Sequence, residues 1–315
     1  MRLQDERGRL AYGRREGTGL EQWSRSRADR LFDIVNMLIF VLVTLIVLYP
    51  LYFILIGAFS DPNLVSRGEV WLYPKGLNFD GFERIFSNGY IWTGYRNTIV
   101  YAALGTAISV ALTITAAYAL ARKDLIGRNV IMFAITFTMF FSGGLIPTYL
   151  LVRELGMVNT MWALVLLPAV SVYQLIIART FIQATIPEEL FEAASIDGCN
   201  HTTFFFRMVL PLSQAIIAVI VLFNVVFHWN SYFPALIYLR DRELQPLQLV
   251  LREILIQSQS SDMSGGYFED TAEQQKLAES IKYGMVIVAS LPMLVLYPFL
   301  QKYFVKGVMI GSIKG

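Results

Sequence analysis

Acidic side chains that could carry chemistry gather in residues 185–212, TIPEELFEAASIDGCNHTTFFFRMVLPL, between two strongly apolar segments. Glu192 and Asp197 are five residues apart, a spacing that does not bring two carboxylates together on one helix face, so they do not suggest an acid–base pair. The whole chain has two histidines and one cysteine, too few for a multi-cysteine metal site. It contains no Walker A, HExxH or GxSxG sequence. The residues therefore predict neither a catalytic centre nor a metal site.

The same stretch contains the local signals of two short helices. Thr185 and Glu188 have the spacing of a capping box at the start of the first helix. Gly198 is expected to end that helix in the left-handed conformation, and Asn200 to cap the next one. Pro211 is expected to close the second helix before the following apolar run. By itself, such a stretch would be an ordinary solvated loop between two membrane spans.

One pair of side chains leaves a second class of function open. Ser142 and His228 are the only nucleophile and base in the apolar segments that can be combined into an intramembrane enzyme. A single histidine in a span is, however, more often a hydrogen-bonded packing residue. A third alternative is a channel or secondary carrier. Apart from Asp33 and Arg179 near their ends, the apolar segments hold no charged residues, which disfavours it because ion-coupled transport needs buried charge.

The composition identifies an integral membrane protein, in which helices must position these residues. The chain has 315 residues, of which 55% are hydrophobic and only 16% charged, compared with roughly a quarter charged in a soluble domain. A helix needs roughly 20 residues to cross a bilayer, and helices satisfy their own backbone in lipid. We therefore expect an all-α membrane protein with six transmembrane helices. The expected spans are residues 31–56, 97–121, 130–152, 161–181, 212–239 and 283–301.

The lysines and arginines predict the orientation of these spans. With the N-terminus inside, 16 of the 26 lie in inner segments, and the excess is clearest in the short 122–128 loop and the C-terminal tail. Residues 185–212 are then cytoplasmic. The expected organisation is a cytoplasmic tail over residues 1–30, a six-span domain over 31–304 and a second cytoplasmic tail over 305–315.

Two patterns predict helix packing. Small residues every four positions in the second span allow another helix to approach closely, and we expect this helix to belong to the same chain rather than to another subunit. Those small residues are Gly105, Ser109, Thr113, Ala117 and Ala121. Residues 245–257 carry apolar side chains at helical spacing, which predicts an amphipathic helix packed on the chain's own outer face.

Two other patterns could form a path for a sugar, which needs flat apolar faces and hydrogen-bonding groups from a binding site. In the third span, two adjacent glycines and a proline predict a broken helix, which is tolerated where it lines a cavity. In the fifth span lies an aromatic cluster, a pattern that is otherwise typical of an interfacial belt. The candidate path residues are Phe141, Gly143, Gly144, Tyr149, Trp229, Asn230, Tyr232 and Phe233.

Several short motifs of the chain resemble those of a known family. EAA at 192–194, IDG at 196–198 and LPL at 210–212 resemble the EAA loop of ABC importer permeases in spacing and in position before the penultimate span. The chain is similar to the carbohydrate-uptake branch, which includes the maltose importer permeases, and most similar to its lipoprotein-transport-like, complex-oligosaccharide members. This similarity rests on FSGGLIP at 141–147, HWNSYF at 228–233 and KYFVKGVM at 302–309. Gln214 and Ala215 depart from the lysine and proline that are frequent there.

The resemblance implies a type I ABC importer permease fold in which the loop before the fifth span forms a cytoplasmic coupling helix. This helix would dock in a groove of a separate ATPase, so that ATP-driven closure of the ATPase reorients the spans. The chain itself would have no ATPase site. The residues implied in coupling are Glu192, Ala193, Ala194, Asp197, Gly198, Leu210 and Pro211.

The resemblance also implies partners. These are a second homologous permease, two ATPase subunits that bind ATP and Mg²⁺, and an extracellular solute-binding protein that delivers an oligosaccharide, with uronate-containing polysaccharide fragments among the candidates. The chain would bind no cofactor and no nucleic acid. It would lie in the cytoplasmic membrane of a bacterium, with both termini in the cytoplasm.

Overall fold

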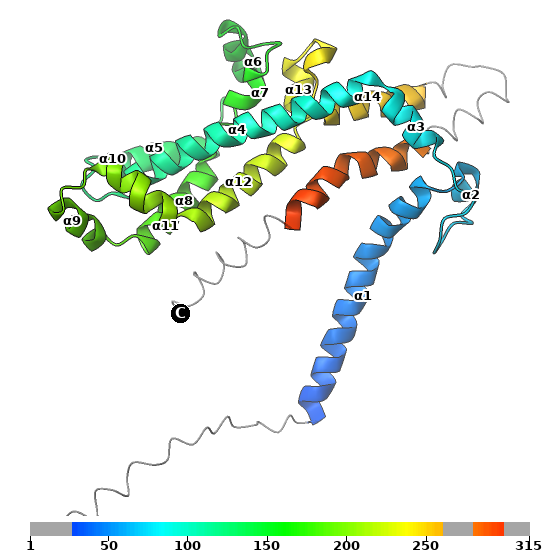
Figure 1. The fold of residues 1–315 in the computed structure, drawn as a ribbon, viewed down its shortest axis with the longest axis horizontal. Helices are drawn as coiled ribbons and strands as arrows, with labels where there is room; N and C mark the ends of the chain where they lie inside the picture. Colours follow the sequence, from blue (N-terminus) through cyan, green and yellow to red (C-terminus); the bar gives the residue numbers. More distant parts are fainter. Residues whose placement is uncertain (1–26, 261–279, 299–315) are drawn as a thin grey trace, which may run out of the picture. The chain divides into compact units, whose positions relative to one another are not determined.

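The computed structural model describes residues 27–260 and 280–298, and these residues form helices without any strand (Figure 1). The chain divides at Tyr52 into two units, which we describe separately. The predicted tails at residues 1–30 and 305–315 lie outside the described residues, apart from the few N-terminal residues that begin helix α1 at Arg27. The sequence KYFVKGVM at 302–309 also lies outside them.

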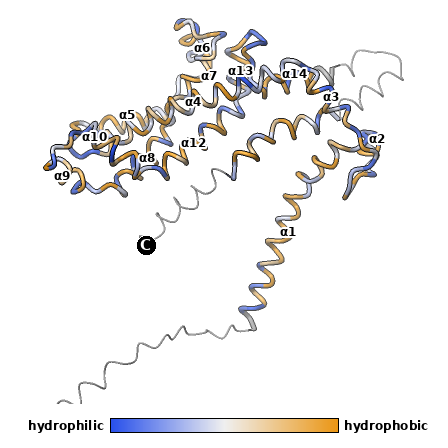
Figure 2. Tube along the Cα trace, in the orientation of Figure 1, coloured by the Kyte–Doolittle hydropathy of each residue, from blue (hydrophilic) through white to orange (hydrophobic). Residues whose placement is uncertain are grey.

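Helix α1 (Arg27–Ala58) corresponds to the first predicted span. From Asp29 to Ala58 it is 30 residues long and apolar enough to cross a membrane. Figure 2 shows mostly hydrophobic residues in this helix, with hydrophilic ones at its N-terminal end, and most of its large apolar side chains up to Leu51 are exposed. A helix that is apolar on all sides suits a lipid environment.

The second unit is organised around helix α4 (Gly89–Ala121), which begins eight residues before the predicted span. Asn88 caps its N-terminus by accepting a hydrogen bond from the Tyr90 amide at 3.0 Å. At 1.5 Å per residue, its 33 residues extend over about 50 Å. Helices α8 (Val172–Thr185) and α12 (Gln214–Trp229) run beside it (Figure 1).

The small residues of α4 face these neighbours. Ser109, Thr113 and Ala117 are fully buried. A Cβ atom added at Gly105 would lie 2.2 Å from Nε2 of His228 on α12. The ladder therefore packs within the chain, and that prediction is confirmed.

The remaining helices are shorter. They are α2 (Pro62–Ser66), α3 (Asp80–Ser87), α5 (Arg128–Phe140), α6 (Leu145–Glu154), α7 (Trp162–Leu166), α9 (Glu188–Ile196), α10 (His201–Phe204), a π turn (Phe205–Val209), α11 (Leu210–Leu212), α13 (Phe233–Tyr238), a 3₁₀ turn (Arg242–Leu244), α14 (Leu247–Ser260) and a last helix over Ser280–Pro298.

The structure does not confirm six spans. In its described part, three helices could cross a membrane, or up to five spans if two bent pairs are counted. The third predicted span is broken into α5 and α6 at 113°, as its glycines predicted, because Gly144 adopts φ 85° and ψ 177°. The fourth predicted span is interrupted between α7 and α8, where Pro168 lacks an amide donor.

The predicted amphipathic helix over residues 245–257 is α14, and it packs on the same chain. Its apolar residues Leu247, Val250 and Leu251 are buried against Ile91 of α4 and the last helix. The Leu247 amide donates a 2.8 Å hydrogen bond to Oγ1 of Thr98 on α4. The beginning of α14 is thus fixed to α4 by both apolar and polar contacts.

Candidate functional site

Helix α9 begins differently from the prediction. Thr185 is the last residue of α8, and Pro187 occupies the N-cap of α9 without a side-chain hydrogen bond. The capping box of Thr185 and Glu188 is therefore wrong, because α8 continues far enough to keep Thr185 in helical conformation. Glu188 instead forms an ion pair with Lys123, at 2.9 Å between Nζ and Oε2.

The end of α9 agrees with the prediction. Gly198 has φ 80°, the left-handed conformation that glycine adopts most easily. Its amide donates to the Ser195 carbonyl at 3.0 Å, and the Cys199 amide donates to the Ala194 carbonyl at 2.9 Å. These two bonds form a Schellman motif. Asn200 then caps α10, as predicted, by accepting a 2.8 Å hydrogen bond from the Thr203 amide.

Pro211 does not close the second helix. The helical path continues from α10 through the π turn into α11, and the break comes at Ser213, where the path bends by 77° into α12. A proline inside an α-helix leaves the carbonyl four residues earlier without a partner and collides with it. The π turn directly before α11 changes the hydrogen-bond register at that place and accommodates the ring. Leu210 packs against the core, whereas Pro211 is exposed.

Helix α9 has two distinct faces. Its inner face packs Leu190, Phe191 and Ala194 against the core cluster around α4, α8 and α12. Its outer face exposes, at helical spacing, Glu189, Glu192, Ala193 and Ile196. Ile196 is 87% exposed, and Asp197 and Gly198 continue the exposed surface. We call these residues the α9 outer face. Of the residues implied in coupling, it contains Glu192, Ala193, Asp197 and Gly198, while Ala194 and Leu210 face the core.

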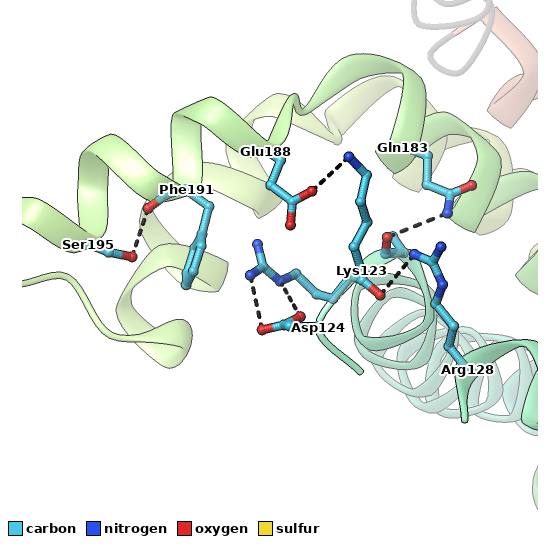
Figure 3. A network of polar contacts seen from close by, with 9 residues as sticks. Lys123, Asp124, Arg128, Gln183, Glu188, Phe191 and Ser195 are labelled. Carbon is cyan, nitrogen blue, oxygen red and sulfur yellow. Dashed lines mark hydrogen bonds and ion pairs between the residues drawn. The ribbon is translucent and has the colours of Figure 1, made fainter. Parts of the chain in front are cut away.

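The loop after α4 contacts α9 through charged side chains (Figure 3). Besides the Lys123 ion pair, the guanidinium of Arg122 lies 3.8 Å from the centroid of the Phe191 ring. Asp124 accepts two hydrogen bonds from Arg122, both at 3.1 Å. The hydrogen bond to Glu188 raises the pKa of the Lys123 amine, and the bond from Arg122 lowers the pKa of the Asp124 carboxyl.

The candidate path residues of the third predicted span lie on either side of its break. Phe141 is exposed and stacks on Phe137 of α5, with ring centroids 4.2 Å apart. Gly143 and Gly144 are exposed at the break itself. Tyr149 is half-buried and stacks on Tyr238 at 6.1 Å. Three of these residues thus lie at the break between α5 and α6, and Tyr149 lies against α13.

The aromatic cluster of the fifth span divides into buried and exposed residues. Trp229 is 5% exposed and donates its indole N–H to the Ala289 carbonyl at 2.9 Å. Its ring therefore serves packing between α12 and the last helix and offers no free face to a solute. Asn230 and Phe233 are exposed, and Tyr232 lies beneath the guanidinium of Arg252, 4.7 Å from its ring centroid.

The enzyme alternative gains no support. His228 is buried against Gly105, and neither of its ring nitrogens has a hydrogen-bond partner in the described part of the chain. It is a packing residue, as expected, although not a hydrogen-bonded one. Ser142 is exposed at the break after α5 and does not pair with it. No group of histidine, cysteine and acidic side chains within residues 27–260 and 280–298 could hold a metal ion.

The chain is similar to known transport proteins, although no protein-family model matches it. It is 40% identical over 287 residues to the polygalacturonan/rhamnogalacturonan transport system permease protein YtcP of Bacillus subtilis. The aligned residues make up 91% of this chain and 99% of YtcP. It is 38% identical over 290 residues to protein LplC of the same bacterium, covering 92% and 97%. The chain belongs to the family of carbohydrate ABC importer permeases.

A solved structure agrees with this membership. A chain of a bacterial ABC transporter involved in the import of the acidic polysaccharide alginate superimposes with a TM-score of 0.79 and 31% identity, covering 89% of the permease and 98% of that chain. The predicted family and all-helical membrane class of the permease are thereby confirmed. YtcP and this solved relative are both described as parts of transport systems.

Sequence reasoning missed the side chains of the permease that hold α9. Arg122 and Lys123 were weighed only as charges that set the orientation of the short loop. Their contacts with Phe191 and Glu188 join residues more than sixty positions apart, and no local pattern predicts such pairs. The only signal was indirect, because the predicted topology places this loop and residues 185–212 on the same side of the membrane.

Proposed function

We propose that the permease is one of two homologous membrane subunits of an ATP-driven importer, and that α9 is its coupling helix. An extracellular binding protein delivers the oligosaccharide. Two ATPase subunits bind ATP and Mg²⁺, and one of them docks on the α9 outer face. The observation that supports this best is the face itself, which combines exposed carboxylates with an isoleucine that is 87% exposed. Exposed carboxylates of this kind can pair with cationic groups on a docking partner.

The proposed topology has both termini and α9 in the cytoplasm. Contacts between distant segments support it. The 122–128 loop touches α9, and both were expected inside. At the other end of α4, Asn97 donates to the carbonyls of Glu243 and Gln245 at 2.7 and 3.0 Å. These two residues stand just before and at the start of the amphipathic helix that was expected on the outer face. Segments expected on one side thus contact each other.

We further propose an acidic oligosaccharide as cargo. YtcP is described as a polygalacturonan/rhamnogalacturonan permease, and the similar solved structure belongs to an importer of an acidic polysaccharide. A carboxylate in the path calls for a cation. Arg252 lies over Tyr232, next to the exposed Asn230 and Phe233, and it forms no ion pair with an acidic side chain in the described residues. We assign it to the sugar carboxylate, with Tyr232 offering its ring face.

The coupling role is tested by reversing one charge on the α9 outer face. Glu192→Lys is expected to abolish uptake of labelled oligosaccharide in cells, and to prevent the ATPase from co-purifying in mild detergent, while membrane levels stay normal. Glu154→Lys, at the exposed end of α6, is the charge-matched control. Normal uptake by a well-expressed Glu192→Lys variant would contradict the role of α9.

The substrate class is tested at Arg252. A hydrogen bond to a charged group contributes about 1.5–3 kcal/mol, so Arg252→Gln should weaken the apparent affinity for an acidic oligosaccharide by about ten-fold or more. Uptake of a neutral analogue should change much less. Arg242→Gln is the control, because Arg242 is paired with Glu253 at 3.8 Å. An equal loss for both substrates would remove Arg252 from carboxylate recognition.

A further inference from the structure

The C-terminal end of α4 is fixed by side chains from two other helices. Arg179 of α8 donates to the Leu120 carbonyl at 2.9 Å, and Gln183 of α8 donates to the Ala121 carbonyl at 3.4 Å. Arg128 of α5 donates to the Arg122 carbonyl at 3.2 Å. Helix C-termini carry unsatisfied carbonyls and a partial negative charge, which donors and cations of this kind satisfy. The backbone of Arg122, which directly follows α4 and precedes Lys123, is therefore fixed in position.

From this end, two side chains reach α9, as Figure 3 shows for Lys123 and Glu188. Lys123 pairs with Glu188 in the first turn of α9 at 2.9 Å. Arg122 lies 3.8 Å from the Phe191 ring centroid, one turn further along. The Phe191 ring also stacks on His201 at 4.7 Å. Two contacts one turn apart fix a direction, whereas a single contact would leave α9 able to pivot.

Apolar contacts also hold α9, among them an edge-to-face contact between the rings of Phe191 and Phe204, with centroids 5.1 Å apart. None of its residues is fully buried, although Leu190, Phe191 and Ala194 contact the core. A cavity of about 310 Å³ lies between α9, the end of α4 and α8, and residues on both sides of it, among them Tyr118, Gln183 and Glu189, line it. The charged contacts of Lys123 and Arg122 therefore act together with the apolar contacts in orienting α9.

We propose that Arg122 and Lys123 are positioning residues that make α9 move together with α4. Together with Glu188 and Phe191 they form what we call the α9 clamp. Through it, a displacement of α9 by the ATPase is passed to an unbroken helix of 33 residues, whose other end holds the loop before α14. The proposal rests on the proposed function, since it assumes that the ATPase acts on α9.

The test measures sugar transported per ATP hydrolysed by the full importer in proteoliposomes. Exposed charge pairs contribute little individually, so Lys123→Glu and Arg122→Ala should each lower this ratio by a factor of about two to five. Lys123→Glu combined with Glu188→Lys should restore most of it, because the pair is re-formed with opposite sense. Arg122→Lys should remain impaired, since an ammonium lacks the planar group that stacks on Phe191. Arg153→Glu, on exposed α6, is the control.

Amide hydrogen exchange of α9 supplies a second readout that does not need transport. It is measured in the full-length chain, both unsubstituted and with each substitution. Faster exchange in α9 of Lys123→Glu and Arg122→Ala supports the clamp, and rescue by the double variant supports the pair. An unchanged transport ratio together with unchanged exchange would overturn the proposal, as would a double variant that rescues neither. If the unsubstituted importer shows no ATP-dependent uptake, the proposed function fails, and the exchange data alone decide whether the clamp exists.

Discussion

Replacing Gly105 by alanine should destabilise the permease by driving α4 and α12 apart. The added Cβ atom would lie 2.2 Å from Nε2 and 2.4 Å from Cε1 of His228, which is only 2% exposed and cannot swing into open space. Overpacking costs about 1–3 kcal/mol, and contacts this short place the cost near the upper end. Alanine recovers about 1 kcal/mol of helix propensity. The expected net loss is about 2 kcal/mol.

The assay is the thermal unfolding midpoint of the detergent-purified importer. At roughly 2–4 °C per kcal/mol for chains of 150–250 residues, Gly105→Ala should lower the midpoint by about 4–8 °C. Gly89→Ala is the control in the same helix, because no atom lies within 4 Å of the added Cβ. Adding His228→Ala to Gly105→Ala should recover stability relative to the sum of the single changes. If Gly105→Ala matches Gly89→Ala, α4 and α12 do not interdigitate at this residue.

Three further predictions concern α9 and α14. Gly198→Val should cost about 1–2 kcal/mol, because a non-glycine residue is strained at φ 80°, and uptake should fall while Gly198→Asn is milder. Leu247→Ala should lower the thermal midpoint, since truncating a buried leucine costs about 2–5 kcal/mol and this side chain is fully buried. Protection of the α9 amides should be constant between about pH 5 and 9. The Lys123 ion pair stabilises α9 fully below the ordinary pKa of lysine, and this stabilisation is lost as the pH rises through the raised pKa of Lys123. The Asp124 pair stabilises the loop fully above the ordinary pKa of aspartate, and this stabilisation is lost as the pH falls through the lowered pKa of Asp124. A step in protection near neutral pH would contradict this prediction.

Features determined by neighbouring residues could be predicted from the sequence. The left-handed stop at Gly198 and the cap at Asn200 depend on backbone groups within a few positions, so residue type alone indicates them. The break at Gly143 and Gly144 follows from the conformational freedom of glycine. The ladder of small residues in α4 indicated a close helix contact, and His228 on Gly105 is such a contact.

Features determined by distant residues could not be predicted. Trp229 resembled a solute-facing aromatic residue, but its indole bonds to a carbonyl 60 residues later. The Thr185 cap failed because α8 continues through it, an outcome set by packing of α8 and not by the cap sequence. The contacts of Arg122 and Lys123 with α9 depend on the tertiary arrangement. Sequence reasoning therefore predicted the end of α9 and the cap of α10 but not the side chains that orient α9.

The absence of fully buried residues in α9 also bears on how such an importer can change partners during evolution. Substitutions at exposed positions usually alter stability by no more than about 0.5 kcal/mol. If an ATPase docks on α9 as proposed, selection can adapt the α9 outer face to a different ATPase with little effect on the membrane domain, as long as Glu188 and Phe191 keep their contacts. Exchanging this nine-residue helix between related permeases should accordingly transfer the choice of ATPase and leave the choice of sugar unchanged.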